Sequence, residues 1–460
     1  MKICFVNALF YPFRGGTENH MFELAEALVK KGVEVHVVTA RLKGTAETEK
    51  MGGIIVHRVP AKLVKIFGFY PPPLVLCPKF LQYLSEIDEK EHFDLFHLHG
   101  RWFPDFTLVR KHCDETNKPL VLTVHNARPN GISPTYTLFG SAYETAIGKN
   151  VLKAADQLIA VSKWTKGDVL KYNLDKRRFT VIYNGINAAK FSTARSAAVK
   201  KKLGMARSDP LLVWVGRVIE QKGLKYLIAA MPAVLKCFPT AKLLLIGTGT
   251  ELKKLKKQAA KLSISNSVVF YGQENNRKKL NNLLRGSDCY VMPSVWETFG
   301  IAALEAMASG LPVVSTNAGG LPELIQNNRN GTIVPMRNSK KLAQALTTIL
   351  ANPTQLKKMG VNSRKDAEKK FNWNKIAHQT IVVYRKAIAS GHEKEKTPLE
   401  EVIAMQGQVA AKLKQMRRKP LAQHLKKLRR LQATKTPKLW IKRLNKLLKI
   451  KLSEFSEFNE

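Results

Sequence analysis

The sequence predicts an α/β protein with two doubly wound parallel sheets, one after the other along the chain. Short apolar runs alternate with helical segments over residues 1–185, and a second series of the same kind begins at residue 211. Polar and small residues collect between the two series, over residues 186–209, as expected of a linker. Strands that alternate with helices favour parallel sheets covered on both faces. Because such sheets bind ligands beyond the carboxyl ends of their strands, we expect a binding cleft between two domains.

The first series opens with a buried strand over Lys2 to Asn7. A loop containing Gly15 and Gly16 follows, and apolar residues then recur at helical spacing from about Thr17 until Gly32 ends the helix. No GxGxxG motif follows the first strand, so the sequence does not indicate a standard dinucleotide site. Further strands are predicted at 33–39, 54–59, 94–99, 120–125, 157–162 and 180–184.

The second series contains the stretch that most constrains function, residues 291–325. Glu297 lies at the turn after a predicted strand, and Gly300 lets the backbone enter a helix that carries Glu305 and stops at Gly310. The free N–H groups at the start of such a helix suit a phosphate, and the two carboxylates can hold hydroxyl groups on either side of it. The predicted strands of this half are 211–216, 242–247, 268–272, 288–293 and 311–315.

A pair of basic residues forms a second candidate binding site in this half. Arg217 follows the strand at 211–216 and Lys222 is expected to open the next helix, so both side chains can reach one anionic group. In so basic a chain, such a pair is often only a solvated surface. Most glutamates are solvated surface groups as well.

These motifs resemble those of the retaining glycosyltransferases of family 4. The stretch 291–325 is similar to the E-x7-E signature of that family, and Arg217 with Lys222 matches its basic pair for the diphosphate of a nucleotide-sugar. The signature matches at Glu297, Phe299-Gly300, Glu305-Ala306, 310–314, Gly319-Gly320 and Pro322-Glu323. Further matches within residues 1–390 are Gly15-Gly16-Thr17-Glu18, Thr123-Val124-His125, Val161-Ser162, Tyr183-Asn184-Gly185 and Gly247-Thr248-Gly249.

The resemblance implies a GT-B architecture, in which two facing Rossmann-like domains bind the acceptor and the donor respectively. The expected divisions are an acceptor-side domain at 1–188, a donor-binding domain at 189–372, a helix at 373–390 that crosses back to the first domain, and a basic tail at 391–460.

The resemblance also implies a role for each site residue. Glu297 and His125 are the expected catalytic residues, Glu297 holding sugar hydroxyls and His125 positioning the sugar or sharing a proton on the acceptor side. The expected donor-binding residues are Gly16 in the closing loop, Arg217 and Lys222 at the diphosphate, Phe299, Gly300 and Ile301 through backbone N–H groups, and Glu305 at the ribose. No metal and no cofactor beyond the nucleotide-sugar substrate are expected.

Other interpretations of the same residues remain open. His125 can be a strand-end histidine satisfied by backbone, and Phe299 a core aromatic whose backbone alone matters. The chain can also be a polyanion-binding protein without catalysis, or an epimerase or phosphorylase of the same fold. The complete E-x7-E signature favours transfer.

From the composition we expect a cytosolic protein. The five cysteines are odd in number, scattered and mostly within apolar runs, which suits reduced thiols. The N-terminal residues are predicted to form a first strand rather than a signal peptide. The sequence contains no run of about 18 apolar residues, so it does not predict a membrane-spanning helix.

The net charge of +41 favours polyanionic partners without choosing among them. Between Val402 and Lys451 there are 16 basic residues and no acidic one, with apolar residues at helical spacing. Such helices bind anionic membrane surfaces, so we expect residues 400–452 to give a peripheral membrane association. The sequence leaves the acceptor open, and a lipid-linked or membrane-resident acceptor would favour this association. A helix packed on the enzyme, a partner-binding coil and a nucleic-acid arm are the alternatives, and nucleic acid is not the expected partner.

Overall fold

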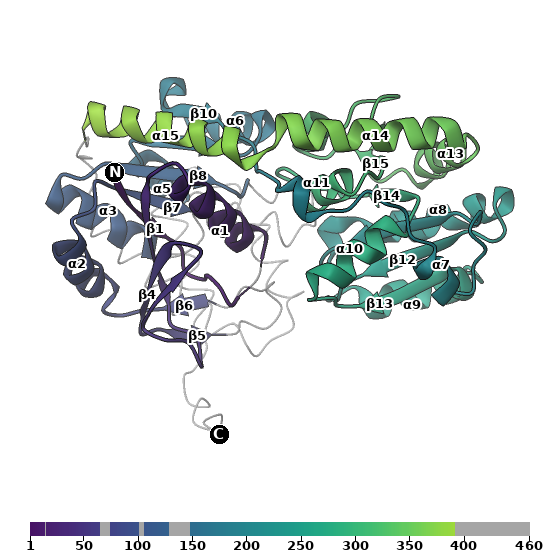
Figure 1. Ribbon diagram of the computed structural model, residues 1–460, viewed down its shortest axis with the longest axis horizontal. Helices are drawn as coiled ribbons and strands as arrows, with labels where there is room; N and C mark the ends of the chain where they lie inside the picture. Colours follow the sequence, from purple (N-terminus) through teal and green to yellow (C-terminus); the bar gives the residue numbers. More distant parts are fainter. Residues whose placement is uncertain (14, 65–73, 101–104, 128–147, 392–460) are drawn as a thin grey trace, which may run out of the picture.

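The computed structural model describes residues 1–13, 15–64, 74–100, 105–127 and 148–391 and shows two α/β lobes side by side (Figure 1). Each lobe is built on its own sheet, which confirms the predicted fold class. The tail lies outside the described residues from position 392 onward.

The first sheet has eight strands in the order β10-β9-β8-β7-β1-β2-β4-β3. Every neighbouring pair is parallel except β3 and β4, which are antiparallel. The strand expected at 180–184 is shorter and begins earlier, at Phe179. The elements are β1 (Lys2–Val6), α1 (Gly16–Val29), β2 (Glu34–Ala40), β3 (Thr48–Met51), β4 (Ile54–Val59), the hairpin β5 (Lys62–Val64) and β6 (Leu74–Leu76), α2 (Phe80–Glu91), β7 (Leu95–His99), α3 (Asp105–Thr116), β8 (Leu120–Val124), α5 (Lys149–Ala154), β9 (Gln157–Ala160), α6 (Lys163–Leu170), η2 (Lys176–Arg178), β10 (Phe179–Val181) and η3 (Ala188–Lys190).

The second sheet has six strands, all parallel, in the order β13-β12-β11-β14-β15-β16. The chain order reverses at β11, which lies between β12 and β14. The elements are α7 (Ala198–Lys202), β11 (Leu211–Val215), η4 (Glu220–Lys222), α8 (Leu224–Cys237), β12 (Lys242–Ile246), α9 (Leu252–Lys261), η5 (Ser265–Ser267), β13 (Val268–Gly272), α10 (Arg277–Arg285), β14 (Cys289–Met292), α11 (Ile301–Ala308), β15 (Val313–Thr316), α12 (Leu321–Leu324), β16 (Gly331–Val334), α13 (Ser339–Leu350), α14 (Pro353–Lys370) and α15 (Trp373–Ser390).

The chain crosses between the lobes twice at one place. On the outward crossing, the backbone N–H of Ile186 donates to the carbonyl of Phe371, 2.7 Å away on the return crossing. A side chain on Gly185 would collide with the indole of Trp373, so the close approach requires glycine there. Before the return crossing α14 covers the second lobe, and after it α15 lies across the first, against α1 (Figure 1).

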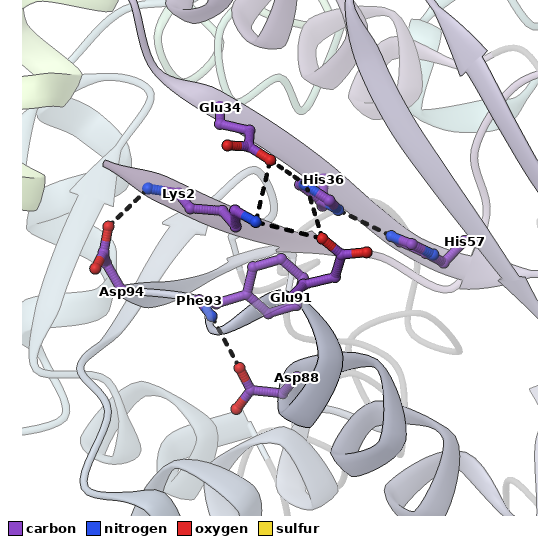
Figure 2. Close-up of polar contacts among 8 residues, drawn as sticks. All are labelled: Lys2, Glu34, His36, His57, Asp88, Glu91, Phe93 and Asp94. Carbon is purple, nitrogen blue, oxygen red and sulfur yellow. Dashed lines mark hydrogen bonds and ion pairs between the residues drawn. The ribbon is translucent and has the colours of Figure 1, made fainter.

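A network of charged and imidazole groups ties β1, β2 and β4 to the end of α2 (Figure 2). The ammonium of Lys2 lies 3.2 Å from Glu34 and 3.3 Å from Glu91. His36 Nε2 is 3.0 Å from the Glu34 carboxylate, and its Nδ1 is 2.9 Å from His57 Nε2. If His36 donates to Glu34, its Nδ1 accepts from His57, so the buried rings are satisfied by one another. Lys2 supplies the cation that the two carboxylates need.

The environment of the cysteines fits the expected free thiols. All five are thiols outside any disulfide; four of them are buried, and Cys237 is exposed. Within the part of the chain that the structure describes, every helix is too short or too polar to cross a bilayer.

Candidate active site

The expected site residues gather where the carboxyl edges of the two sheets meet. Arg217 follows β11 and Glu297 follows β14, and these strands are neighbours at the point where the strand order reverses. Open parallel sheets form their ligand crevice at such a point. Gly16 begins α1 on the first domain, and a side chain there would lie 3.5 Å from the tip of Ile301 on the second. The two edges therefore face each other, and their boundary is where the interdomain cleft is expected.

An ion pair joins two of the predicted residues. Lys222 Nζ lies 2.5 Å from the Glu297 carboxylate, and both side chains are mostly buried. Lys222 ends the 3-10 turn η4 rather than opening α8, which corrects the expected placement. Gly223 follows in a left-handed conformation, and a side chain there would strike the carbonyl of Pro293. The turn can therefore approach the end of β14 only with glycine at this position.

Arg217 is exposed to solvent as a residue, while its guanidinium loses part of its hydration to the surrounding protein. Burial lowers the pKa of its guanidinium to about 10, while the carboxylates of Glu297 and Glu18 act in the opposite direction. Burial also raises the pKa of Glu18 to about 7, and Arg217 and a hydrogen bond from Asn7 oppose that shift. Glu18 belongs to α1 of the first domain, so an electrostatic interaction spans the cleft. Glu18 had no predicted role beyond its match to the glycine loop.

The start of α11 supplies the backbone groups expected at a phosphate. Gly300 caps this helix with a φ of 108°, a conformation that favours glycine. The first N–H groups of a helix have no partner within it, so those from Ile301 onward can serve a ligand. The ring of Phe299 is buried, 5.9 Å from the ring of Tyr183 and 5.8 Å from that of Phe371. Its side chain is thus a core aromatic, as the alternative interpretation held.

Glu305 lies on α11 and has a basic partner that sequence reasoning missed. Arg277, the first residue of α10, donates from Nη1 to the Glu305 carboxylate at 2.5 Å. Burial raises the pKa of Glu305, and Arg277 works against that rise. Only the fold brings the two residues together, because 28 positions separate them.

His125 lies with two other buried histidines on the first domain. Its Nε2 is 3.2 Å from Nδ1 of His99, and its ring centre is 4.7 Å from that of His20. Burial lowers the pKa of all three imidazoles, that of His20 to about 3. At neutral pH these rings are therefore uncharged and can donate or accept hydrogen bonds. His20 and His99 were not among the predicted site residues.

Two groups of side chains in the described ranges can hold a metal ion, and neither includes Glu297 or Glu305. Imidazole-rich sets suit transition metals rather than magnesium, and in this fold each carboxylate of the E-x7-E pair already has a basic partner. The groups are His20 with His99 and His125, and His36 with His57 and Glu91.

Two known protein families match this chain, one over each domain. Residues 14–190 match Glycosyltransferase Family 4, and residues 196–366 match Glycosyl transferases group 1. An uncharacterized glycosyltransferase of Methanocaldococcus jannaschii is 32% identical over 405 residues, which cover 84% of this chain and 99% of the relative. The chain belongs to the family 4, or group 1, glycosyltransferases.

Solved structures show the same fold for this glycosyltransferase. Sucrose-phosphate synthase from Thermosynechococcus elongatus superposes with a TM-score of 0.70 at 24% identity, over 85% of this chain and 99% of that one. The Anabaena protein HepE, in complex with UDP-glucose, superposes with a TM-score of 0.65 at 21% identity, over 85% of this chain and 100% of its own. The predicted GT-B architecture is thereby confirmed.

Proposed function

We propose that this glycosyltransferase moves a sugar from a nucleotide-sugar donor to an acceptor with retention of anomeric configuration and without a metal. The observation that carries the proposal is the convergence of Arg217, Lys222 and the start of α11 around Glu297 at the strand-order reversal. The Anabaena structure, which holds UDP-glucose on the same fold, supports the choice of donor.

The charges of the site suit the departure of a nucleoside diphosphate. Bond cleavage builds negative charge on the diphosphate, and Arg217, Lys222 and the α11 N–H groups are preorganised to stabilise it. In this structure Lys222 is paired with Glu297. A bound diphosphate would compete for Lys222, leaving the Glu297 carboxylate to accept hydrogen bonds from sugar hydroxyls. Glu305, oriented by Arg277, would accept from the ribose.

The acceptor side is built from neutral groups. His125 is uncharged at neutral pH because burial lowers its pKa well below the usual value, so it would position an acceptor hydroxyl by hydrogen bonding. Its contact with His99 fixes the orientation of the ring. An acceptor that is lipid-linked or membrane-resident fits the basic tail, which would bring enzyme and acceptor to one surface.

We expect the product to retain the anomeric configuration of the donor. Purified protein would be incubated with a panel of nucleotide-sugars, and the donor that releases its nucleoside diphosphate would be used with the acceptor it modifies. Proton NMR of the fresh product then reports the anomer directly. An inverted anomer would exclude the proposed mechanism, and release of no diphosphate from any donor would favour a binding protein.

Transfer is also expected to continue in EDTA. Arg217, Lys222 and the α11 N–H groups supply the positive potential that a magnesium ion provides in other transferases. Initial rates would be compared with and without excess chelator, at equal ionic strength. Activity abolished by EDTA and restored by magnesium would refute metal independence.

The tail is expected to bind anionic membranes, since each Lys or Arg near such a surface can add about 1 kcal/mol of binding free energy. The measurement is co-sedimentation with phosphatidylserine-containing vesicles at moderate salt, comparing the full chain with one that ends at Ser390. Equal binding by the two proteins would show that the tail is not the anchor. If neither binds, membrane association itself is wrong.

A further inference from the structure

The loop that carries Glu297 is held from the opposite domain. Thr298, the next residue, presents its carbonyl to the hydroxyl of Ser162, which donates to it at 2.7 Å. Ser162 is the N-cap of α6 in the first domain, where its oxygen also accepts from the backbone N–H of Thr165. One hydroxyl therefore caps a helix of the acceptor-side domain and binds the backbone beside the donor-side carboxylate.

A second set of bonds crosses the cleft beside the first. The Glu323 carboxylate, on α12 of the second domain, accepts from the backbone N–H of Lys163 at 2.8 Å and from that of Trp164 at 2.9 Å. These N–H groups belong to the first turn of α6, where the helix offers unpaired donors and a partial positive charge. Glu323 also hydrogen-bonds to Tyr183. Each oxygen of the Glu323 carboxylate thus accepts one backbone donor at this end of the helix.

Two glycines let these bonds form. A side chain on Gly320 would strike the Thr298 carbonyl, and it would lie 3.0 Å from the Cβ of Ser162. A side chain on Gly319 would strike the carbonyl of Glu297. The Gly320 N–H donates to that same carbonyl at 3.1 Å. The Glu297 loop is thus held on one side by its own domain and on the other by α6.

We propose that Glu323 and Ser162 are positioning residues, which fix the Glu297 loop only when the start of α6 is docked on it. Domain closure and alignment of Glu297 then become one event, because the bonds that close the cleft are the bonds that hold the loop. This inference rests on the proposed donor-binding role of Glu297. Glu323 touches the backbone of α6 rather than the donor groups, so its loss should affect turnover more than nucleotide affinity.

The test uses the full chain with Glu323→Gln, which keeps the size of the side chain but replaces one acceptor oxygen with a donor. Hydrogen exchange read by mass spectrometry would follow peptides covering 161–170 and 295–304, and UDP, ADP and GDP would be titrated as probes of the donor site. We expect faster exchange in both peptides, a fall in kcat of about tenfold, and a nucleotide Kd changed by less than about twofold. Glu323→Asp, which keeps the charge, should recover part of the protection and the turnover.

The matched control is Glu115→Gln, the same substitution at an exposed ion pair on α3. Unchanged exchange at 161–170 would show that Glu323 does not hold α6 in solution. Faster exchange at 161–170 with an unchanged 295–304 peptide would overturn the positioning role, as would unchanged turnover. Hydrogen exchange can be measured in a protein that has no activity. A wild-type protein that transfers no sugar would refute the proposed function, and the exchange of the two peptides would still decide whether Glu323 holds the loop.

Discussion

Arg217→Ala is expected to lower the rate of glycosyl transfer about a hundredfold while leaving the protein folded, because loss of one preorganised charged contact at a developing anion commonly costs about 3 kcal/mol. Arg217 is solvent-exposed, so its guanidinium can reach a diphosphate, and it interacts electrostatically with Glu297 and Glu18. The measurement is kcat/KM with the donor identified by diphosphate release, together with circular dichroism of the variant.

An exposed arginine of the same domain provides the control. Arg207→Ala removes an equal charge from the surface and should leave kcat/KM unchanged. Lys222→Ala and Glu297→Ala should each cost about as much as Arg217→Ala. Because these two residues pair at 2.5 Å, their double variant should lose less than the sum of the single losses. More than a third of wild-type turnover in Arg217→Ala would remove this residue from the proposed role.

Gly319→Ala is expected to reduce the rate of glycosyl transfer by a similar factor, because it displaces the Glu297 loop without removing any charged group. Gly319 has a φ of 54°, and a Cβ there would collide with the carbonyl of Glu297. The backbone of the Glu297 loop must then move, and a displacement of about 1 Å in a positioned catalytic group can cost about a hundredfold in rate. The measurement is the transfer rate at saturating donor, with Tm determined in parallel.

Gly204→Ala is the control that separates the effect of backbone strain from the effect of a steric collision. Gly204 has a φ of 66°, close to that of Gly319, but a Cβ there would meet no heavy atom within 4 Å. Both variants carry the left-handed strain of about 1–2 kcal/mol, so both should lower Tm. Only Gly319→Ala should lose transfer. Equal activity in the two variants would mean that the Glu297 loop tolerates the shift.

The fold was largely predictable because its central strands are apolar and its helices amphipathic. The strands missed were those without that pattern. Thr48–Met51, which forms β3 at the sheet edge, has no buried residue, so apolar periodicity could not mark it. The hairpin of β5 and β6 has only three residues in each strand, and β16 has four that begin with a glycine, too few for a periodic signal.

The predicted donor residues come together in the structure. Their interaction partners, in contrast, could be identified only from the structure. Arg217, Lys222 and Glu297 each follow a strand, and strand ends of a parallel sheet share an edge. Arg277 carries no such signal, since it opens a surface helix in a basic chain and is selected only by its distance to Glu305. His20 lies on the inner face of α1, where its spacing is that of any core residue. Whether these residues act in transfer stays a prediction.

The packing of α15 on the first domain bears on how the protein is made. Ile376, Ala377 and Tyr384 of this helix are buried in the core that the first sheet and α1 share. The Tyr384 hydroxyl lies 2.6 Å from Nδ1 of His97 on β7. The ribosome completes this helix only at Ser390, long after it has delivered the last strand of that sheet. A nascent chain that folds from its N-terminus thus carries an uncovered apolar groove throughout synthesis of the second domain, a surface for chaperones to shield.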